Sequence, residues 1–252
     1  MPPAILFFFG FRTCFGFRDS DFEIRFFQYV AVKLKVTMYP HRIRLRGPWE
    51  CEPIEGPPPR RVFMPNGWLA AGLSGFHGVA RFTRKFGYPG QIDDGEHVWL
   101  ICDGCNGCQE VRLNGHLLTQ DRVKSFAFDV TGMLTARNRF EVLISGEADD
   151  AGLWGDVALE VRRDAYLADV RVLRVERGIA IDGRAVGTSP QALELYTLVD
   201  NRHADYRTIQ PKPAGEPFRI ELPEVTSRNE SVRVELIHIS AIWYAVELPM
   251  PR

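Results

Sequence analysis

The segment Val111-Arg-Leu-Asn-Gly-His-Leu117 is the strongest local indication of fold in this 252-residue chain. Asn-Gly tolerates positive φ at both central positions of a two-residue turn, and between apolar residues it joins two strands in a type I′ hairpin. We therefore predict a β-hairpin centred on Asn114 and Gly115.

Short apolar runs continue on both sides of this hairpin, separated by Gly, Pro, Asp and Asn, which is the pattern of strands and turns. No segment between them has a helical period, so we predict an all-β sandwich rather than a parallel α/β sheet. The predicted strands are centred on Ile43 and Leu45; Ala80 and Phe82; Val98-Trp-Leu-Ile101; Val111 and Leu113; Phe126, Phe128 and Val130; Phe140, Val142 and Ile144; and Val157, Leu159 and Val161.

A second series of strands follows the polar segment Arg162-Arg-Asp-Ala-Tyr166, where we place a domain boundary. The sequence thus predicts a first sandwich over residues 38–163 and a smaller, immunoglobulin-like sandwich over residues 164–252, without cysteines and hence without an inter-sheet disulfide. The strands predicted in the second part are Leu167–Glu176, Ile179–Val186, Leu193–Leu198, Phe218–Leu222, Val232–Ile239 and Ile242–Leu248.

Residues 1–37 do not fit this pattern. The segment Ala4-Ile-Leu-Phe-Phe-Phe-Gly-Phe11 is apolar. A signal peptide has a basic residue before its apolar segment, and none precedes this one. Arg12 and Arg18 end the apolar segment well before the length that a membrane-spanning helix needs. We predict that this extension is disordered or an artefact of start-site choice, with Met38 as the first residue of the functional protein.

Charge and cysteine content limit the possible partners. The 31 Lys and Arg residues balance 32 Asp and Glu residues, which argues against nucleic acid and against an anionic membrane surface. The five cysteines are too few and odd in number for a disulfide framework, so we predict a cytoplasmic protein. No phosphate-binding loop or dinucleotide motif occurs, and no cofactor is predicted.

Four motifs, taken in order, resemble one known family. The chain is similar to the N-terminal sugar-binding domain of family 2 glycoside hydrolases, which is a galactose-binding-like jelly roll. The segments that carry the resemblance are Met64-Pro-Asn-Gly-Trp68 with Gly75-Phe-His-Gly-Val-Ala-Arg-Phe-Thr-Arg-Lys-Phe86, the Asn-Gly hairpin, Phe126-Ala-Phe-Asp-Val-Thr-Gly-Met-Leu134, and Gly152-Leu-Trp-Gly-Asp-Val-Ala-Leu159.

In that family an immunoglobulin-like sandwich and then a catalytic (β/α)8 barrel follow the jelly roll, and the barrel alone needs roughly 250 residues. The two catalytic glutamates of the family lie on the barrel, so the resemblance predicts no catalytic residue here. The Asn229-Glu230 dipeptide copies the family's acid/base motif, but we interpret it as a hairpin turn. The resemblance implies a non-catalytic carbohydrate-binding or accessory module. The alternatives are a structural or protein-interaction module, whose partner is a glycosidase or another protein, and a component of a β-glycosidase.

Loop residues are the candidates for saccharide binding, because jelly rolls carry their sites in the loops at strand ends. Aromatic rings and planar polar groups suit a pyranose, so the candidates are Trp68, His77, Asp149, Asp150 and Trp154. Trp68 and Trp154 have an alternative interpretation as core residues. We expect Trp99 and Trp243 in the core.

The sequence Cys102-Asp-Gly-Cys105-Asn-Gly-Cys108 has a spacing that suits zinc or an iron–sulfur cluster. No fourth ligand stands at zinc-motif spacing. We therefore expect no metal site and interpret Cys102, Cys105 and Cys108 as small buried thiols, with a metal centre as the alternative.

Overall fold

The computed structural model describes residues 40–146, 151–225 and 230–251. Within these ranges the chain contains strands β1 to β20, one 3-10 turn (Thr131–Met133) and no α-helix, so the all-β prediction is confirmed. No helix of the described part is long and apolar enough to cross a membrane. The predicted extension, residues 1–37, lies outside the described residues.

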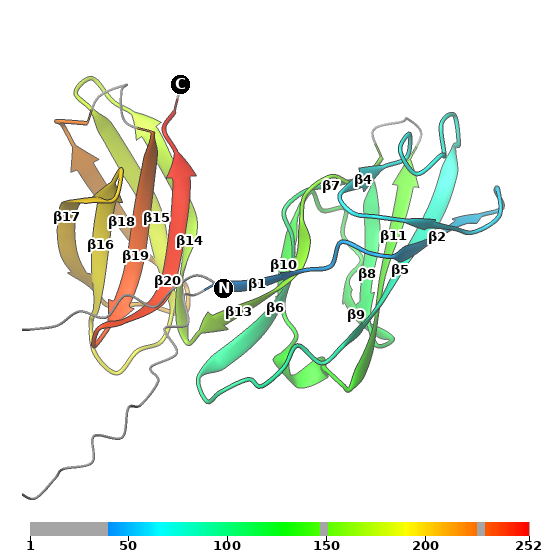
Figure 1. The fold of residues 1–252 in the computed structure, drawn as a ribbon, viewed down its shortest axis with the longest axis horizontal. Coiled ribbons are helices and arrows are strands. Elements are labelled where there is room, and N and C mark those ends of the chain that lie inside the picture. Colours follow the sequence, from blue (N-terminus) through cyan, green and yellow to red (C-terminus); the bar gives the residue numbers. More distant parts are fainter. Residues whose placement is uncertain (1–39, 147–150, 226–229, 252) are drawn as a thin grey trace, which may run out of the picture. The chain divides into compact units, whose positions relative to one another are not determined.

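The first part of the chain forms three antiparallel sheets (Figure 1). One sheet has the order β1 (His41–Arg44), β13 (Val157–Arg163), β6 (Glu96–Cys102) and β10 (Phe126–Asp129). The largest has the order β3 (Arg60–Val62), β2 (Trp49–Ile54), β5 (Gly78–Gly87), β11 (Arg137–Gly146), β8 (Cys108–Leu113) and β9 (His116–Thr119). A short one joins β4 (Asn66–Gly67), β12 (Gly152–Leu153) and β7 (Cys105–Asn106).

In these strands the residues that alternate along the sequence alternate between buried and exposed positions. In β2 the residues alternate between buried and exposed from Trp49 to Ile54, as expected when one face of a sheet covers a core. Trp49 is fully buried, packs edge-to-face on Phe140 at 5.5 Å between ring centroids, and donates its indole N–H to the Leu45 carbonyl at 2.6 Å. The tryptophan is therefore buried with its polar atom satisfied.

The second part contains two sheets. The first has the order β14 (Ala165–Arg174), β15 (Ile179–Gly187) and β18 (Glu216–Leu222). The other has the order β17 (Arg202–Ile209), β16 (Leu193–Val199), β19 (Ser231–His238) and β20 (Ala241–Pro249). Strand β17 was not predicted, because it lies at a sheet edge and only its last residue, Ile209, is buried.

The strands of these sheets contribute to two clusters of buried apolar residues. One runs from Leu45 to Val161 and the other from Ala165 to Tyr244, and they share no residue. The sequence boundaries at 163 and 164 fall between them and remain a prediction.

The Asn-Gly hairpin is confirmed between β8 and β9, with φ of 53° at Asn114 and 83° at Gly115. Asn114 does more than turn the chain. Its side-chain amide donates to the Met133 carbonyl at 2.8 Å and to Asn138 Oδ1 at 2.9 Å, and its Oδ1 accepts the Arg139 N–H at 2.8 Å. The hairpin is thus fixed to the start of β11.

Candidate functional site

The structure contradicts the prediction that Trp68 contacts a saccharide. Its side chain is 0% exposed and packs against Phe76, with 5.2 Å between ring centroids. A ring without exposed surface cannot offer a face to a pyranose, so Trp68 is a core residue in this structure. Its indole N–H is buried without a hydrogen-bond partner in the described part of the chain.

Trp154 is 49% exposed and directly follows β12. Its ring lies on Gly67, where any Cβ would overlap the indole, and Gly67 pairs with Gly152 between β4 and β12. The sequence therefore positions an aromatic face on the surface by placing glycine beneath it. His77 is also exposed and follows Phe76, which contacts Trp68. The predicted residues Asp149 and Asp150 lie outside the described residues.

The three clustered thiols are buried, with Cys102, Cys105 and Cys108 at most 6% exposed. Cys105 Sγ donates to the Val123 carbonyl at 3.2 Å, and Cys102 Sγ to the Gly104 carbonyl at 3.4 Å. Hydrogen bonds from the other two thiols lower the pKa of Cys105. No group of three His, Cys, Asp or Glu side chains in the described ranges has a geometry that could hold a metal ion.

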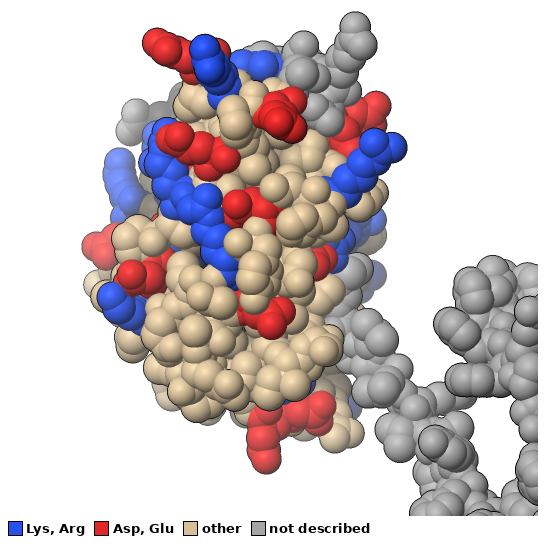
Figure 2. Space-filling model, turned by 90° about the vertical axis from the view of Figure 1, so that its left-hand side faces the viewer, with Lys and Arg blue, Asp and Glu red and all other residues tan. Residues whose placement is uncertain are grey.

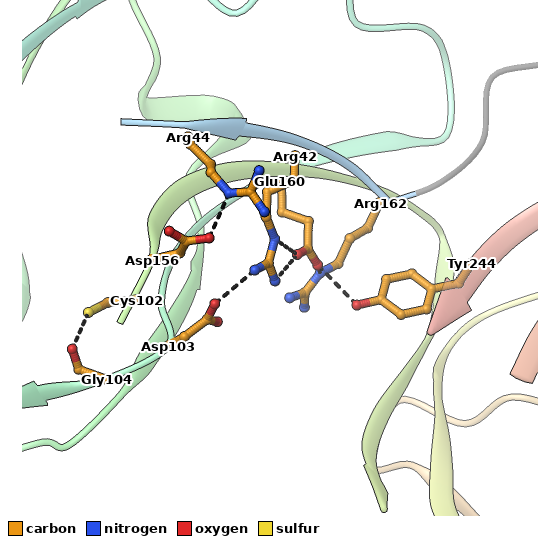
Figure 3. Close-up of polar contacts among 9 residues, drawn as sticks. All are labelled: Arg42, Arg44, Cys102, Asp103, Gly104, Asp156, Glu160, Arg162 and Tyr244. Atoms are coloured by element: carbon orange, nitrogen blue, oxygen red, sulfur yellow. Dashed lines mark hydrogen bonds and ion pairs between the residues drawn. The ribbon is translucent and has the colours of Figure 1, made fainter. Parts of the chain in front are cut away.

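A buried carboxylate, Glu160 on β13, is the centre of a polar cluster that joins several strands (Figure 3). Arg42 donates from Nε at 3.1 Å and from Nη2 at 2.8 Å to Glu160 Oε2. Arg162 Nε donates to Oε1 at 2.7 Å, and the Tyr244 hydroxyl donates to the same oxygen at 3.0 Å. Arg42 also pairs with Asp103 at 2.8 Å.

Strand register explains this convergence. Arg42 lies directly opposite Glu160 in the β1–β13 pair, and Arg162 follows Glu160 by two residues on the same side of the strand. The Arg162 guanidinium stacks on both Trp99 and Tyr166, 4.5 Å from each ring centroid. Trp99 and Trp243 were both predicted to be core residues. Trp99 is half-buried, and Trp243 is half-buried where it packs against the second core.

The protonation of this cluster suits structure rather than acid–base chemistry. Burial raises the pKa of Glu160, but the charges and hydrogen bonds of Arg162 and Arg42 outweigh this effect and hold the pKa below its ordinary value. Burial and the neighbouring Glu160 raise the pKa of Tyr244. A carboxylate that already accepts four hydrogen bonds at full burial is a poor proton donor or nucleophile.

Sequence reasoning missed this cluster, although one signal was present. In Val157-Ala-Leu-Glu-Val-Arg162 a glutamate interrupts an apolar run in which every residue is buried. A charged residue in such a strand needs a partner of opposite charge. The partner on β1 is distant in sequence, so the pairing could not be read from the run.

Basic and acidic side chains are interspersed on the face drawn in Figure 2, with a broad area of uncharged residues below them. No field of one sign dominates this face. The pattern agrees with the near-neutral charge of the chain.

No family model and no curated protein matches the chain. Solved structures do match. An FMN-binding β-glucuronidase from Faecalibacterium prausnitzii L2-6 aligns over 84% of this chain and 39% of its own, with 15% identity and a TM-score of 0.64. A β-glucuronidase from Bifidobacterium dentium aligns over 84% of this chain and 49% of its own, with 18% identity and a TM-score of 0.63.

A β-glycosidase from Bacteroides vulgatus aligns over 83% of this chain and 33% of its own, with 17% identity and a TM-score of 0.61. The chain therefore spans less than half the length of these three proteins. At such identities the likeness is one of fold. The chain shares a β-sandwich architecture with part of each of these glycosidase chains.

Proposed function

We propose that this chain is a non-catalytic carbohydrate-binding or accessory module related to family 2 glycoside hydrolases. In this proposal residues 38–163 form a galactose-binding-like jelly roll and residues 164–252 an immunoglobulin-like sandwich. The observation that carries it is the alignment of 84% of this chain with only 39% of a β-glucuronidase chain. The ordered motifs from Met64 to Leu159 support the same family.

The saccharide contact in this proposal is Trp154. Its half-exposed ring beside β12 supplies the apolar face that a pyranose stacks on, and His77 adds a polar group among the loops around Trp68. The chemistry is binding and orientation, and the hydrolysis of O-glycosyl bonds belongs to a partner glycosidase.

A glycan array followed by calorimetry on the full chain tests this function. We expect one or more saccharides to bind, and Trp154→Ala to weaken binding by about tenfold, the usual effect of removing an aromatic contact worth 1–2 kcal/mol. Trp99→Phe is the matched control, since it changes a tryptophan distant in sequence from β12. Equal affinity of Trp154→Ala and the unaltered chain would refute the role of Trp154.

The second candidate is a structural or protein-interaction module. The Glu160 cluster favours it, because Tyr244 of β20 and Glu160 of β13 join the two predicted sandwiches by a buried hydrogen bond. A module that supports another protein needs such a contact to hold its two parts together. Stable co-elution with a glycosidase, with no saccharide bound, is the result that would select this candidate.

A further inference from the structure

A second surface feature lies away from the loops around Trp154. A groove of about 470 Å³ is lined by residues 48–50, 59–61 and 83–85, which belong to β2, β3, β5 and the turns beside them. Ligand pockets for small molecules have volumes of about 300–1,000 Å³, so the groove has room for one or two sugar residues.

Positive charge gathers in this groove. Arg60, Arg61, Arg84 and Lys85 line it against a single carboxylate, Glu50. None of these four basic side chains forms an ion pair with another described residue, although Glu50 lies opposite Arg61 in the β2–β3 register. Neighbouring arginines of the same sheet do pair: Arg81 with Glu52 at 3.0 Å, and Arg139 with Glu141 at 2.9 Å.

Two of the guanidinium groups are held in place by the backbone. Arg84 Nη1 donates to the Pro48 carbonyl at 2.8 Å, and Arg60 Nη1 donates to the Gly72 carbonyl at 3.0 Å. Arg84 Nε is buried and has no hydrogen-bond partner in the described structure. A buried donor without a partner is costly unless a ligand or a water molecule accepts its hydrogen bond. Fixed guanidinium groups bind carboxylate and sulfate oxygens with little loss of entropy.

We propose that this groove binds the carboxylate or sulfate groups of an acidic saccharide. This inference rests on the proposed carbohydrate-binding function and assigns it a ligand class. The lining residues favour a saccharide over a nucleic acid, because the single aromatic residue among them, Trp49, is fully buried and cannot stack on a base. The exposed rings of Pro48 and Pro59 offer apolar surface to the C–H face of a sugar.

Isothermal titration calorimetry of the full chain tests the proposal. The probes are a hyaluronan tetrasaccharide, which carries carboxylates, a heparin-derived tetrasaccharide, which also carries sulfates, and neutral chitotetraose. We expect the two acidic probes to bind, and to bind more weakly at high salt. Comparing the affinities of the hyaluronan and heparin probes distinguishes recognition of carboxylates from recognition of sulfates. The Arg61→Glu/Lys85→Glu variant should bind them at least about tenfold more weakly, since it reverses two charges at the groove.

The matched control is Arg122→Glu/Arg202→Glu, which makes the same change of charge at two exposed arginines that do not line the groove. We expect its affinity to stay within about twofold of the unaltered chain. Arg84→Gln, which keeps a neutral donor, is a second groove variant and should also weaken binding.

Four results would overturn the inference. The first is binding of the acidic probes that is lost in Trp154→Ala but kept in Arg61→Glu/Lys85→Glu, and the second is binding of chitotetraose as tight as that of the acidic probes. Either result would refute the role of the groove and leave the proposed function standing. Absence of binding to every saccharide would refute both the groove and the carbohydrate-binding function, and would leave the structural or protein-interaction module. Tighter binding of a ten-nucleotide thymidine strand than of either acidic tetrasaccharide would refute the ligand class.

Discussion

Replacing Glu160 with alanine should strongly destabilise the fold although it leaves the aromatic core intact. The substitution removes a fully buried carboxylate and leaves the Arg162 guanidinium, whose side chain is only 10% exposed, without its counter-ion. It also leaves the buried Tyr244 hydroxyl without its acceptor. Breaking a buried ion pair from one side costs about 3–5 kcal/mol.

The lower half of that range is expected here. The Arg42 side chain is 32% exposed and keeps its contact with Asp103, so its charge can be solvated after the change. The guanidinium of Arg162 also keeps its two aromatic neighbours. We therefore expect the free energy of unfolding to fall by about 3 kcal/mol.

Urea unfolding followed by tryptophan fluorescence measures this loss. The control is Asp156→Ala, which breaks the more exposed Arg44–Asp156 pair and should cost less than about 1 kcal/mol. Losses of similar size in the two variants, or a loss below about 1 kcal/mol in Glu160→Ala, would refute the interpretation of this cluster as a buried clamp.

The pH dependence follows from the lowered pKa of Glu160. A carboxylate with a depressed folded pKa stabilises the fold above its unfolded pKa, about 4.3, and this contribution disappears as the pH falls through the folded pKa. The stability difference between the unaltered chain and Glu160→Ala should therefore be constant above about pH 5 and shrink below about pH 4. A difference that stays constant down to pH 3 would contradict this assignment.

Three further outcomes follow from the structure. Trp68→Ala should lower the free energy of unfolding by about 3–5 kcal/mol, whereas the same change at the half-exposed Trp154 should cost less than half as much; chemical denaturation of both variants compares them. Asn114→Ala should cost about 1–3 kcal/mol in the same assay, since it removes three hydrogen bonds at the hairpin, and a loss of a few tenths would show that they contribute little. Burial raises the pKa of the Cys51 thiol to about 11, so alkylation of Cys51 by iodoacetamide at pH 8, read by peptide mass spectrometry, should be far slower in the native chain than in urea.

The amino-acid sequence predicted most of the longer strands and the Asn-Gly turn, but it did not predict β2 or β17. The period-two alternation around Phe140 and the Asn114-Gly115 dipeptide act within a few residues, so they are legible without the fold, and both are confirmed. Local pattern failed at β17, whose residues are nearly all exposed because the strand lies at a sheet edge.

The tertiary structure decided which side chains face solvent and which charges meet. Trp68 and Trp154 have similar loop contexts in the sequence, yet one is buried under Phe76 and the other lies exposed over Gly67. Arg42 and Glu160 are 118 residues apart and become neighbours only through the β1–β13 pairing. The basic groove likewise forms where β2, β3 and β5 converge. Such sites depend on long-range strand pairing, which no local period encodes.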